Sequence, residues 1–229
     1  MHGAVSFGML EKALPKKIEL IFLHGFLGSP LDWEKTISYL PAHYSCRVPD
    51  LADGTQINFS PLSVLIGYSM GGRIALQMPP ACGLVLIGAH FGLTNEPERR
   101  KRREEEERLC IHLKRDPIDF IDWWYRQPLF STLPLNDELR KRRESIDFTQ
   151  HAQLFEWFAL SKQPLFIPPP SALLLYGEND KKYANLYSAW PNAHAIPDAG
   201  HAAHLENPKM TAQFIQHYVE GIYAQNGSG

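Results

Sequence analysis

The stretch SVLIGYSMGGRIALQM (63–78) decides the fold of this chain. It opens with the short apolar run Ser63–Ile66 and closes with Gly72–Met78, which has the composition of a helix. Between them stands Gly67-Tyr68-Ser69-Met70-Gly71, a GxSxG sequence that places a serine on a tight turn from strand to helix. Glycines let neighbouring backbone approach such a turn closely. The stretch therefore predicts that Ser69 lies at a helix N-terminus, where free N–H groups favour a reacting oxygen.

Similar short apolar runs, bounded by turn residues, recur along the chain. They are Ile18–Leu23, Cys46–Val48, Leu84–Ile87 and Ala172–Tyr176. Runs of this kind suit strands that are buried on both faces of a parallel sheet. Helix-like stretches stand at Leu31–Leu40 and Pro208–Tyr223. Strands that alternate with helices predict an α/β fold, in which helices flank a mostly parallel sheet.

The alternation stops at about residues 91–170, where we predict no strand. The charged and aromatic parts of this block are Glu98–Cys110, Phe120–Phe130 and Asp137–Arg143. A helical insertion between two strands lies above the carboxyl edge of the sheet, where open α/β sheets bind ligands. We therefore expect a single domain in which residues 1–90 and 171–226 form the core and 91–170 form a helical lid.

Length and composition fit a soluble globular domain. The 229 residues are 44% apolar and 21% charged, and the formal net charge of −2 does not suggest binding to nucleic acid or a membrane surface. Three widely spaced cysteines without a CxxC pair indicate reduced thiols, with neither a disulfide framework nor a metal site. No window reaches the roughly 18 apolar residues of a membrane span, and residues 1–17 do not resemble a signal peptide. We expect a cytoplasmic protein.

Two later segments supply partners for Ser69. Asp180 follows an apolar run within Gly177-Glu178-Asn179-Asp180, and His201 precedes the last predicted helix. The order serine, aspartate, histidine is that of folds with a GxSxG elbow. A serine hydroxyl becomes reactive when an imidazole accepts its proton, and a carboxylate fixes the tautomer of that imidazole. Asp180 is preferred because it lies farther beyond the strand, and Glu178 is the alternative.

The oxyanion hole is expected between two loops. His24-Gly25 ends the first strong strand, at the place from which such folds supply an oxyanion N–H group. The residue after the nucleophile supplies the second donor. The backbone N–H groups of Phe26 and Met70 are therefore the candidate donors to a developing negative charge.

Seven stretches spread over most of the chain also carry a resemblance. They are LHGFLGSPLDW (23–33), GYSMGGR (67–73), GAHFGLTNEPERRKRR (88–103), DWWYRQPLF (122–130), LRKRR (139–143), YGENDKKY (176–183) and AGHAAHLENP (199–208). In them the chain resembles the α/β-hydrolase superfamily. More narrowly, it is similar to the family of 2-succinyl-6-hydroxy-2,4-cyclohexadiene-1-carboxylate synthases of menaquinone biosynthesis. The lid stretches and the arginine after GYSMGG are the more specific part of this resemblance.

The resemblance implies a lyase. Ser69, activated by His201, would take a proton from a succinyl-enolpyruvyl cyclohexene carboxylate, and pyruvate would be eliminated. No metal and no organic cofactor is implied. The substrate carries several carboxylates, which arginines grip in bidentate fashion. Carried over by position, the substrate-binding residues are His24, Tyr68, Arg73, Arg102, Trp124 and Arg143.

Two of these assignments leave alternatives open. Arg142 adjoins Arg143 and is the alternative to it. Arg102 stands in a row of i,i+4 pairs of basic residues with glutamates, which is equally typical of a solvated helix. The chain also departs from the family at Leu51–Leu62, where relatives usually have a longer segment with a helix. We expect one face of the sheet to be thinly covered there, which favours self-association.

The main alternative function is that of a small carboxylesterase or thioesterase of the same fold. An example is a pimeloyl-carrier-protein methyl ester esterase, whose partner would be an acyl carrier protein. Arginines that converge on Ser69 favour a small, multiply anionic substrate, whereas an apolar tunnel favours an acyl chain. A binding protein without activity is disfavoured because no member of the triad is missing.

Overall fold

The computed structural model describes residues 18–54 and 56–226 of the chain. The start of the predicted core, which includes the segment considered as a signal peptide, lies outside the described residues. The fold is built on a six-stranded parallel sheet in the order β2-β1-β3-β4-β5-β6. Its strands are β1 (Glu19–Leu23), β2 (Ser45–Arg47), β3 (Ser63–Tyr68), β4 (Gly83–Ile87), β5 (Leu173–Gly177) and β6 (Ala193–Ile196).

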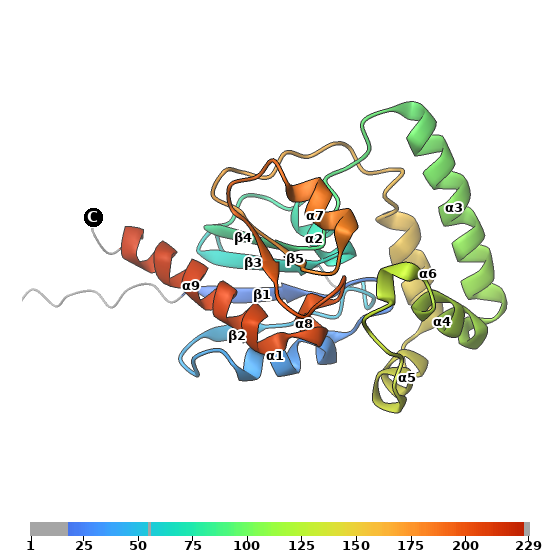
Figure 1. The fold of residues 1–229 in the computed structure, drawn as a ribbon, viewed down its shortest axis with the longest axis horizontal. Helices are drawn as coiled ribbons and strands as arrows, with labels where there is room; N and C mark the ends of the chain where they lie inside the picture. Colours follow the sequence, from blue (N-terminus) through green and yellow to red (C-terminus); the bar gives the residue numbers. More distant parts are fainter. Residues whose placement is uncertain (1–17, 55, 227–229) are drawn as a thin grey trace, which may run out of the picture.

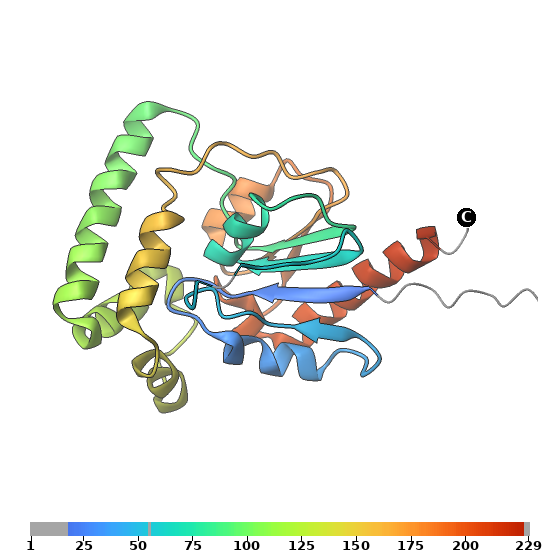
Figure 2. The same cartoon turned by 180° about the vertical axis from the view of Figure 1, so that it is seen from behind.

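Helices cover both faces of this sheet (Figures 1 and 2). The helices of the described chain are α1 (Glu34–Ser38), α2 (Met70–Ala75), α3 (Glu96–Arg115), α4 (Pro117–Tyr125), α5 (Asp137–Glu144), α6 (Phe148–Trp157), α7 (Lys181–Tyr187), α8 (Ala203–Glu206) and α9 (Pro208–Asn226), with 3-10 turns η1 (Pro30–Trp33) and η2 (Pro128–Phe130). Alternate side chains of β1 point to opposite faces. Leu20 belongs to the apolar cluster on the face that carries α1 and α9, while Ile21 belongs to the cluster on the face that carries α2 and α7. The predicted α/β fold is confirmed.

The first five strands lie within two residues of the predicted runs, whereas β6 was not predicted. It pairs only with β5, at the edge of the sheet, and His194 in its middle is exposed. An edge strand with one solvated side does not need the continuous apolar run that identifies a central strand. Helix α7 was also missed because it spans only two turns.

Between β4 and β5 the described chain forms no strand and instead folds into α3, α4, α5 and α6. Each of these helices begins with an aspartate or asparagine side chain that accepts a backbone N–H bond, as helix caps do. Figure 2 shows that the strand arrowheads point toward these helices, so the insertion lies beyond the carboxyl edge of the sheet. Residues 158–172 return to β5 without helix or strand.

Residues 51–54 and 56–62, between β2 and β3, form neither helix nor strand. A groove of about 570 Å³ lies there, lined by Ile57, Phe59, Ile74 and Trp157 among others. Trp157 is 65% exposed, so this face carries apolar surface. Self-association through it stays a prediction. Within the described part of the chain, no helix combines the length and the hydropathy needed to cross a bilayer.

Candidate active site

Ser69 stands on the turn between β3 and α2, with φ 51° and ψ −110°. Positive φ is uncommon for a residue with a side chain, and such strain persists only where the surroundings enforce it. Two glycines make room for the turn. A Cβ on Gly67 would lie 2.5 Å from the backbone N of Gly72, and one on Gly71 would overlap the carbonyl oxygen of Leu23. The turn therefore holds the serine hydroxyl at the carboxyl edge of the sheet.

His201 connects this hydroxyl to Asp180. The distance from His201 Nε2 to Ser69 Oγ is 3.3 Å, and the distance from His201 Nδ1 to Asp180 Oδ2 is 2.8 Å. Because the carboxylate can only accept, Nδ1 carries the proton and Nε2 is left to accept from the hydroxyl. Both His201 and Asp180 are buried. The three side chains thus have the order of contacts that a serine, histidine and aspartate triad requires.

The structure places Asp180, and not Glu178, against the imidazole. The second carboxylate oxygen of Asp180 accepts the backbone N–H of Tyr183 at 3.2 Å and so caps α7. Glu178 is exposed and accepts the N–H of Asp198 at 3.2 Å. Capping a helix while bonding to His201 keeps the Asp180 carboxylate in one position.

Three aromatic rings enclose the imidazole of His201. The ring centroids of Tyr68, Tyr183 and Phe130 lie 5.3, 5.0 and 5.8 Å from it. Tyr183 is nearly parallel to the imidazole, with an interplanar angle of 27°. Phe130 comes from the helical insertion, whereas the tyrosines come from β3 and α7. The rings exclude water and restrict rotation of His201, and neither Tyr183 nor Phe130 was predicted from the sequence.

The predicted oxyanion donors lie in the loops after β1 and β3. The turn after β1 is closed by the Gly28 N–H, which donates to the Gly25 carbonyl at 3.0 Å. Within the described residues, the backbone N–H groups of Phe26 and Met70 donate to no other protein group. Both are therefore free to bond to an oxygen near Ser69.

Arg73, on α2, is buried without a carboxylate partner among the described residues. Its Nη1 donates to the carbonyl oxygen of Phe158 at 2.5 Å and lies 3.4 Å from Oε1 of Gln163, and both acceptors are neutral. Burial lowers the pKa of Arg73 to about 10, so it is still a cation at neutral pH. Burying a charge without a counter-charge is costly. An anionic ligand beside Arg73 would offset that cost.

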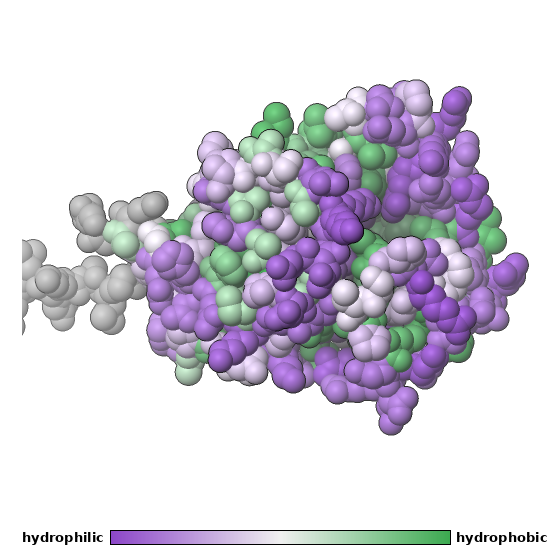
Figure 3. Space-filling model, viewed as in Figure 1, coloured by the Kyte–Doolittle hydropathy of each residue, from purple (hydrophilic) through white to green (hydrophobic). Residues whose placement is uncertain are grey.

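Arg102 and Trp124 line one cavity of about 610 Å³ between α3, α4 and η2, which also contains Phe130. This volume lies in the usual range for small-molecule sites. Figure 3 shows apolar side chains in the recess beside α3, with hydrophilic ones around it. Trp124 packs edge-on against Phe26, with ring centroids 5.3 Å apart. Phe130 lines this cavity and also contacts the imidazole of His201, so it connects the cavity to the triad.

Arg102 also keeps the ion pair expected on a solvated helix. Its Nε donates to Glu106 at 2.8 Å. Glu106 is buried and accepts the N–H groups of Leu160 and Ser161, so it fixes the arginine in turn. The side chain of Arg102 is still 28% exposed, and it lines the cavity. The two interpretations of Arg102 are therefore compatible.

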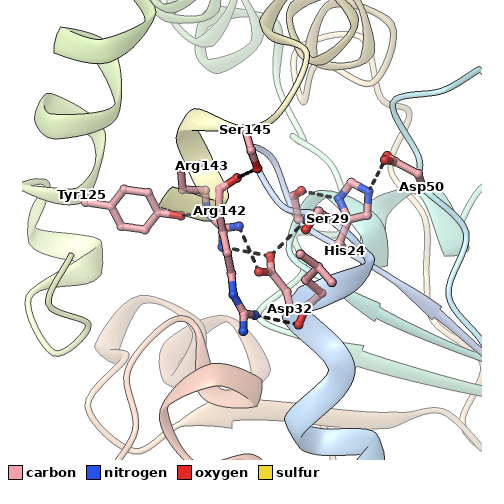
Figure 4. Close-up of polar contacts among 10 residues, drawn as sticks. His24, Ser29, Asp32, Asp50, Tyr125, Arg142, Arg143 and Ser145 are labelled. Atoms are coloured by element: carbon pink, nitrogen blue, oxygen red, sulfur yellow. Dashed lines mark hydrogen bonds and ion pairs between the residues drawn. The ribbon is translucent and has the colours of Figure 1, made fainter. Parts of the chain in front are cut away.

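Arg143 lies in a buried ion pair, shown in Figure 4. Its Nη1 and Nη2 each donate to a carboxylate oxygen of Asp32 at 2.9 Å, and its Nε donates to the Tyr125 hydroxyl at 2.6 Å. Although burial lowers the pKa of Arg143, Tyr125 and Asp32 raise it overall. Arg142 instead reaches the Leu31 carbonyl and Glu138. The sequence carried no signal for the Asp32 pair, which spans 111 residues.

His24 and Tyr68 lie beside the triad and are engaged within the protein. His24 is fully buried, its Nε2 accepts the Leu51 N–H at 3.0 Å, and its Nδ1 donates to the Gly25 carbonyl at 2.9 Å. The Tyr68 ring packs against His204, with centroids 4.2 Å apart. Residues 18–54 and 56–226 contain no group of three histidine, cysteine or acidic side chains placed to hold a metal.

Comparison with known proteins identifies the relatives of this chain. The sequence model of the Alpha/beta hydrolase family matches residues 49–214. The chain is 33% identical over 226 residues to the 2-succinyl-6-hydroxy-2,4-cyclohexadiene-1-carboxylate synthase of Shigella sonnei, a match that covers 82% of this chain and 88% of that protein. The synthase of Salmonella schwarzengrund is 32% identical over 228 residues, with 85% and 90% covered.

Solved structures share the fold. MenH from S. aureus superimposes with a TM-score of 0.78 at 22% identity, covering 92% of this chain and 96% of that one. A thermophilic esterase from Thermogutta terrifontis, with malate bound, gives a TM-score of 0.68 at 20% identity, with 90% of each chain covered. MenH and an esterase thus share this architecture, and the fold alone does not choose between activities.

Proposed function

Because this chain belongs to the alpha/beta hydrolase family, and within it to the 2-succinyl-6-hydroxy-2,4-cyclohexadiene-1-carboxylate synthases, we propose that it is a pyruvate-eliminating lyase. Its substrate would be 2-succinyl-5-enolpyruvyl-6-hydroxy-3-cyclohexene-1-carboxylate. The observation that carries the proposal is the contact series Ser69–His201–Asp180, with 3.3 and 2.8 Å between successive side chains. This contact series occurs in a chain that is 33% identical to a 2-succinyl-6-hydroxy-2,4-cyclohexadiene-1-carboxylate synthase.

The reaction is a 1,4-elimination. His201 Nε2 accepts the hydroxyl proton of Ser69, and the serine oxygen removes the proton from ring carbon 2, which the succinyl ketone acidifies. The electron pair forms the 2,3 double bond, the 3,4 double bond moves to 4,5, and the bond from carbon 5 to the enolpyruvyl oxygen breaks. His201 returns the proton to the leaving group, which becomes pyruvate. Ser69 acts as a base and forms no acyl-enzyme.

The surrounding residues stabilise the charges of this step. The N–H groups of Phe26 and Met70 would bind the enolate oxygen that forms on the succinyl ketone. Asp180 holds the Nδ1–H tautomer of His201 and stabilises the imidazolium. Arg73 and Arg102 would bind substrate carboxylates, with the ring resting on Trp124. For Arg143, the pair with Asp32 favours a role in holding α5 against η1 over direct contact with substrate.

The same contacts also suit hydrolysis of an ester through an acyl-enzyme. The alternative is therefore a small carboxylesterase or thioesterase, including one that acts on an acyl carrier protein. Arg73 favours the lyase, because a buried cation without a carboxylate partner suits a compact polyanion better than a neutral ester.

The test incubates purified protein with the cyclohexene substrate and follows pyruvate by a coupled dehydrogenase, with Ser69→Ala as the control. We expect pyruvate in amounts equal to the substrate consumed, and a loss of at least about 10³-fold in Ser69→Ala. A neutral p-nitrophenyl ester is measured in parallel. No pyruvate together with rapid ester hydrolysis would replace the lyase by the esterase.

A further inference from the structure

Two polar groups on the first turn of α7 have no role in the proposed reaction. Lys182 is exposed, and its ammonium forms no ion pair with a described carboxylate. Tyr183 is 6% exposed, yet its hydroxyl makes no hydrogen bond to any described residue. Tyrosine hydroxyls of largely buried residues normally have a hydrogen-bond partner. The Tyr183 oxygen is not fully enclosed, so it faces space that water or a ligand atom can reach. An unpartnered hydroxyl beside an unpaired cation indicates that a ligand completes the site.

Both groups lie next to the triad. The ring of Tyr183 stacks on His201 with centroids 5.0 Å apart, and its backbone N–H donates to Asp180. The Lys182 ammonium lies 5.4 Å from the centroid of the same tyrosine ring. The Tyr183 ring therefore contacts both the Lys182 ammonium and the imidazole that accepts the proton.

The neighbourhood has an excess of positive charge. Although the Lys182 side chain is exposed, neighbouring atoms remove part of the hydration of its ammonium; this loss of hydration and the charge of Arg102 lower the pKa of Lys182. Burial, helped by Lys182 and Arg73, lowers the pKa of His90 to about 4, so this histidine is neutral. Burial raises the pKa of Tyr183 to about 12, so its hydroxyl keeps the proton that it can donate.

The nearby carboxylates are already occupied. Asp180 bonds to His201 and caps α7, and Glu106 bonds to Arg102 and two backbone N–H groups. Glu105 lies 3.9 Å from Arg102. None of these acids forms an ion pair with Arg73 or Lys182. Cations held together without a counter-charge repel one another, and a bound anion removes that repulsion.

We propose that Lys182 and the Tyr183 hydroxyl, together with Arg73, form a subsite for one carboxylate of the substrate. This inference rests on the proposed function in that it takes the substrate to be a polycarboxylate. A carboxylate has enough lone pairs to accept from all three groups, and bonds to charged donors are about twice as strong as neutral ones. The subsite would place the ring beside His201 and discriminate against neutral esters.

The neighbouring residue Lys181 provides a matched control, because it is also an exposed lysine on the first turn of α7. The probe is 2-succinylbenzoate, which carries a succinyl chain and a ring carboxylate on a flat ring. Its affinity for the full chain is measured by calorimetry in the wild type, Lys182→Met, Lys181→Met and Tyr183→Phe. We expect Kd to rise at least 10-fold in Lys182→Met, 3- to 10-fold in Tyr183→Phe and less than 2-fold in Lys181→Met.

Turnover separates this subsite from the proposed reaction. In pyruvate release, Lys182→Met should raise KM at least 10-fold and change kcat less than 3-fold. The subsite is overturned if the two lysine variants weaken binding equally, if Lys182→Met binds like the wild type, or if the wild type does not bind the probe. Selective loss of probe binding in Lys182→Met, in a protein that releases no pyruvate, would keep the subsite and reject the lyase. Urea midpoints equal to the wild type check that each variant is folded.

Discussion

The carboxyl edge of the sheet and the helical insertion hold their charged groups in different ways. At the edge, Ser69 and Asp180 stand directly after strands, and tight turns fix their backbone. In the insertion, Arg102 and Arg143 are positioned by side-chain ion pairs on otherwise polar helices. The geometry at the edge therefore depends on the backbone, whereas the geometry of the insertion depends on individual pairs.

The two buried arginines make this difference concrete. Arg73, at the edge, bonds only to neutral oxygens of Phe158 and Gln163. Arg143, in the insertion, is neutralised by Asp32. Both were expected to bind substrate. The surroundings of Arg73 agree with this expectation, because its charge is left for a ligand, whereas Arg143 uses its charge to stabilise the fold.

The largest effect is expected at the edge of the sheet. Asp180→Asn should lower kcat/KM for pyruvate release about 10⁴-fold, because the amide no longer holds the Nδ1–H tautomer of His201. Asparagine can still cap α7, so the urea midpoint should change little. Glu178→Gln is the matched control and should stay within about 2-fold of wild type. A loss in Glu178→Gln as large as that in Asp180→Asn would reverse the assignment of the acid.

The second effect concerns stability in the insertion. Arg143→Met should lower the free energy of unfolding by about 3–5 kcal/mol, because it leaves Asp32 as a buried charge without a partner. Urea denaturation measures this change. Arg142→Met, which removes a partly exposed pair, should cost at most about 1 kcal/mol. The double variant Arg143→Met/Asp32→Leu should recover part of the loss; if it recovers nothing, the ion pair is not what Arg143 contributes.

The third effect contrasts Arg73 with Arg143. Arg73→Met should raise KM about 10- to 100-fold, since a hydrogen bond to a charged group contributes about 1.5–3 kcal/mol. Its free energy of unfolding should not fall, because the variant removes a buried cation without a counter-charge. Hydrolysis of a neutral ester, if present, should be largely unaffected. A stability loss like that of Arg143→Met, with KM unchanged, would make Arg73 structural.

The smallest effect is a dependence of stability on pH that both regions share. Burial lowers the pKa of His204, below the edge, to about 3 and that of His151, on α6, to about 4. A histidine with a folded pKa below its unfolded value of about 6.5 stabilises fully above that value and loses the contribution as pH falls toward the folded pKa. Each of these two histidines should therefore lower the free energy of unfolding by about 1.4 kcal/mol at pH 5.5.

Urea unfolding at pH 7.5 and 5.5 measures this loss. His204→Leu should remove the part of this loss that comes from His204, because leucine cannot be protonated. The His204 ring packs against Trp33 and Tyr68, so an apolar side chain suits the site. His217→Leu, at an exposed site, should leave the difference between the two pH values as it is in the wild type. Equal behaviour of the two variants would show that burial of His204 does not set the acid sensitivity.

Local signals were enough for much of the fold. The five predicted strands are short, largely apolar runs, and the glycines around Ser69 mark a turn that no other residue allows. The segment containing β6 carries no such signal because it is a half-exposed edge. Helix α7 could have been recognised from Asp180 as its cap, since the bond to the Tyr183 N–H joins residues three apart.

The sequence by itself determined the α/β fold and the turn that carries Ser69, because both depend on patterns of residues close together in the chain. The order of serine, aspartate and histidine can also be read directly along the chain. Only the tertiary structure decided that Asp180 meets His201, that Asp32 neutralises Arg143 and that Tyr183 and Phe130 enclose the imidazole. These contacts join segments that are distant in sequence. The packing of helices against the sheet decides which charged side chains and which rings come into contact. Local sequence patterns do not predict these contacts.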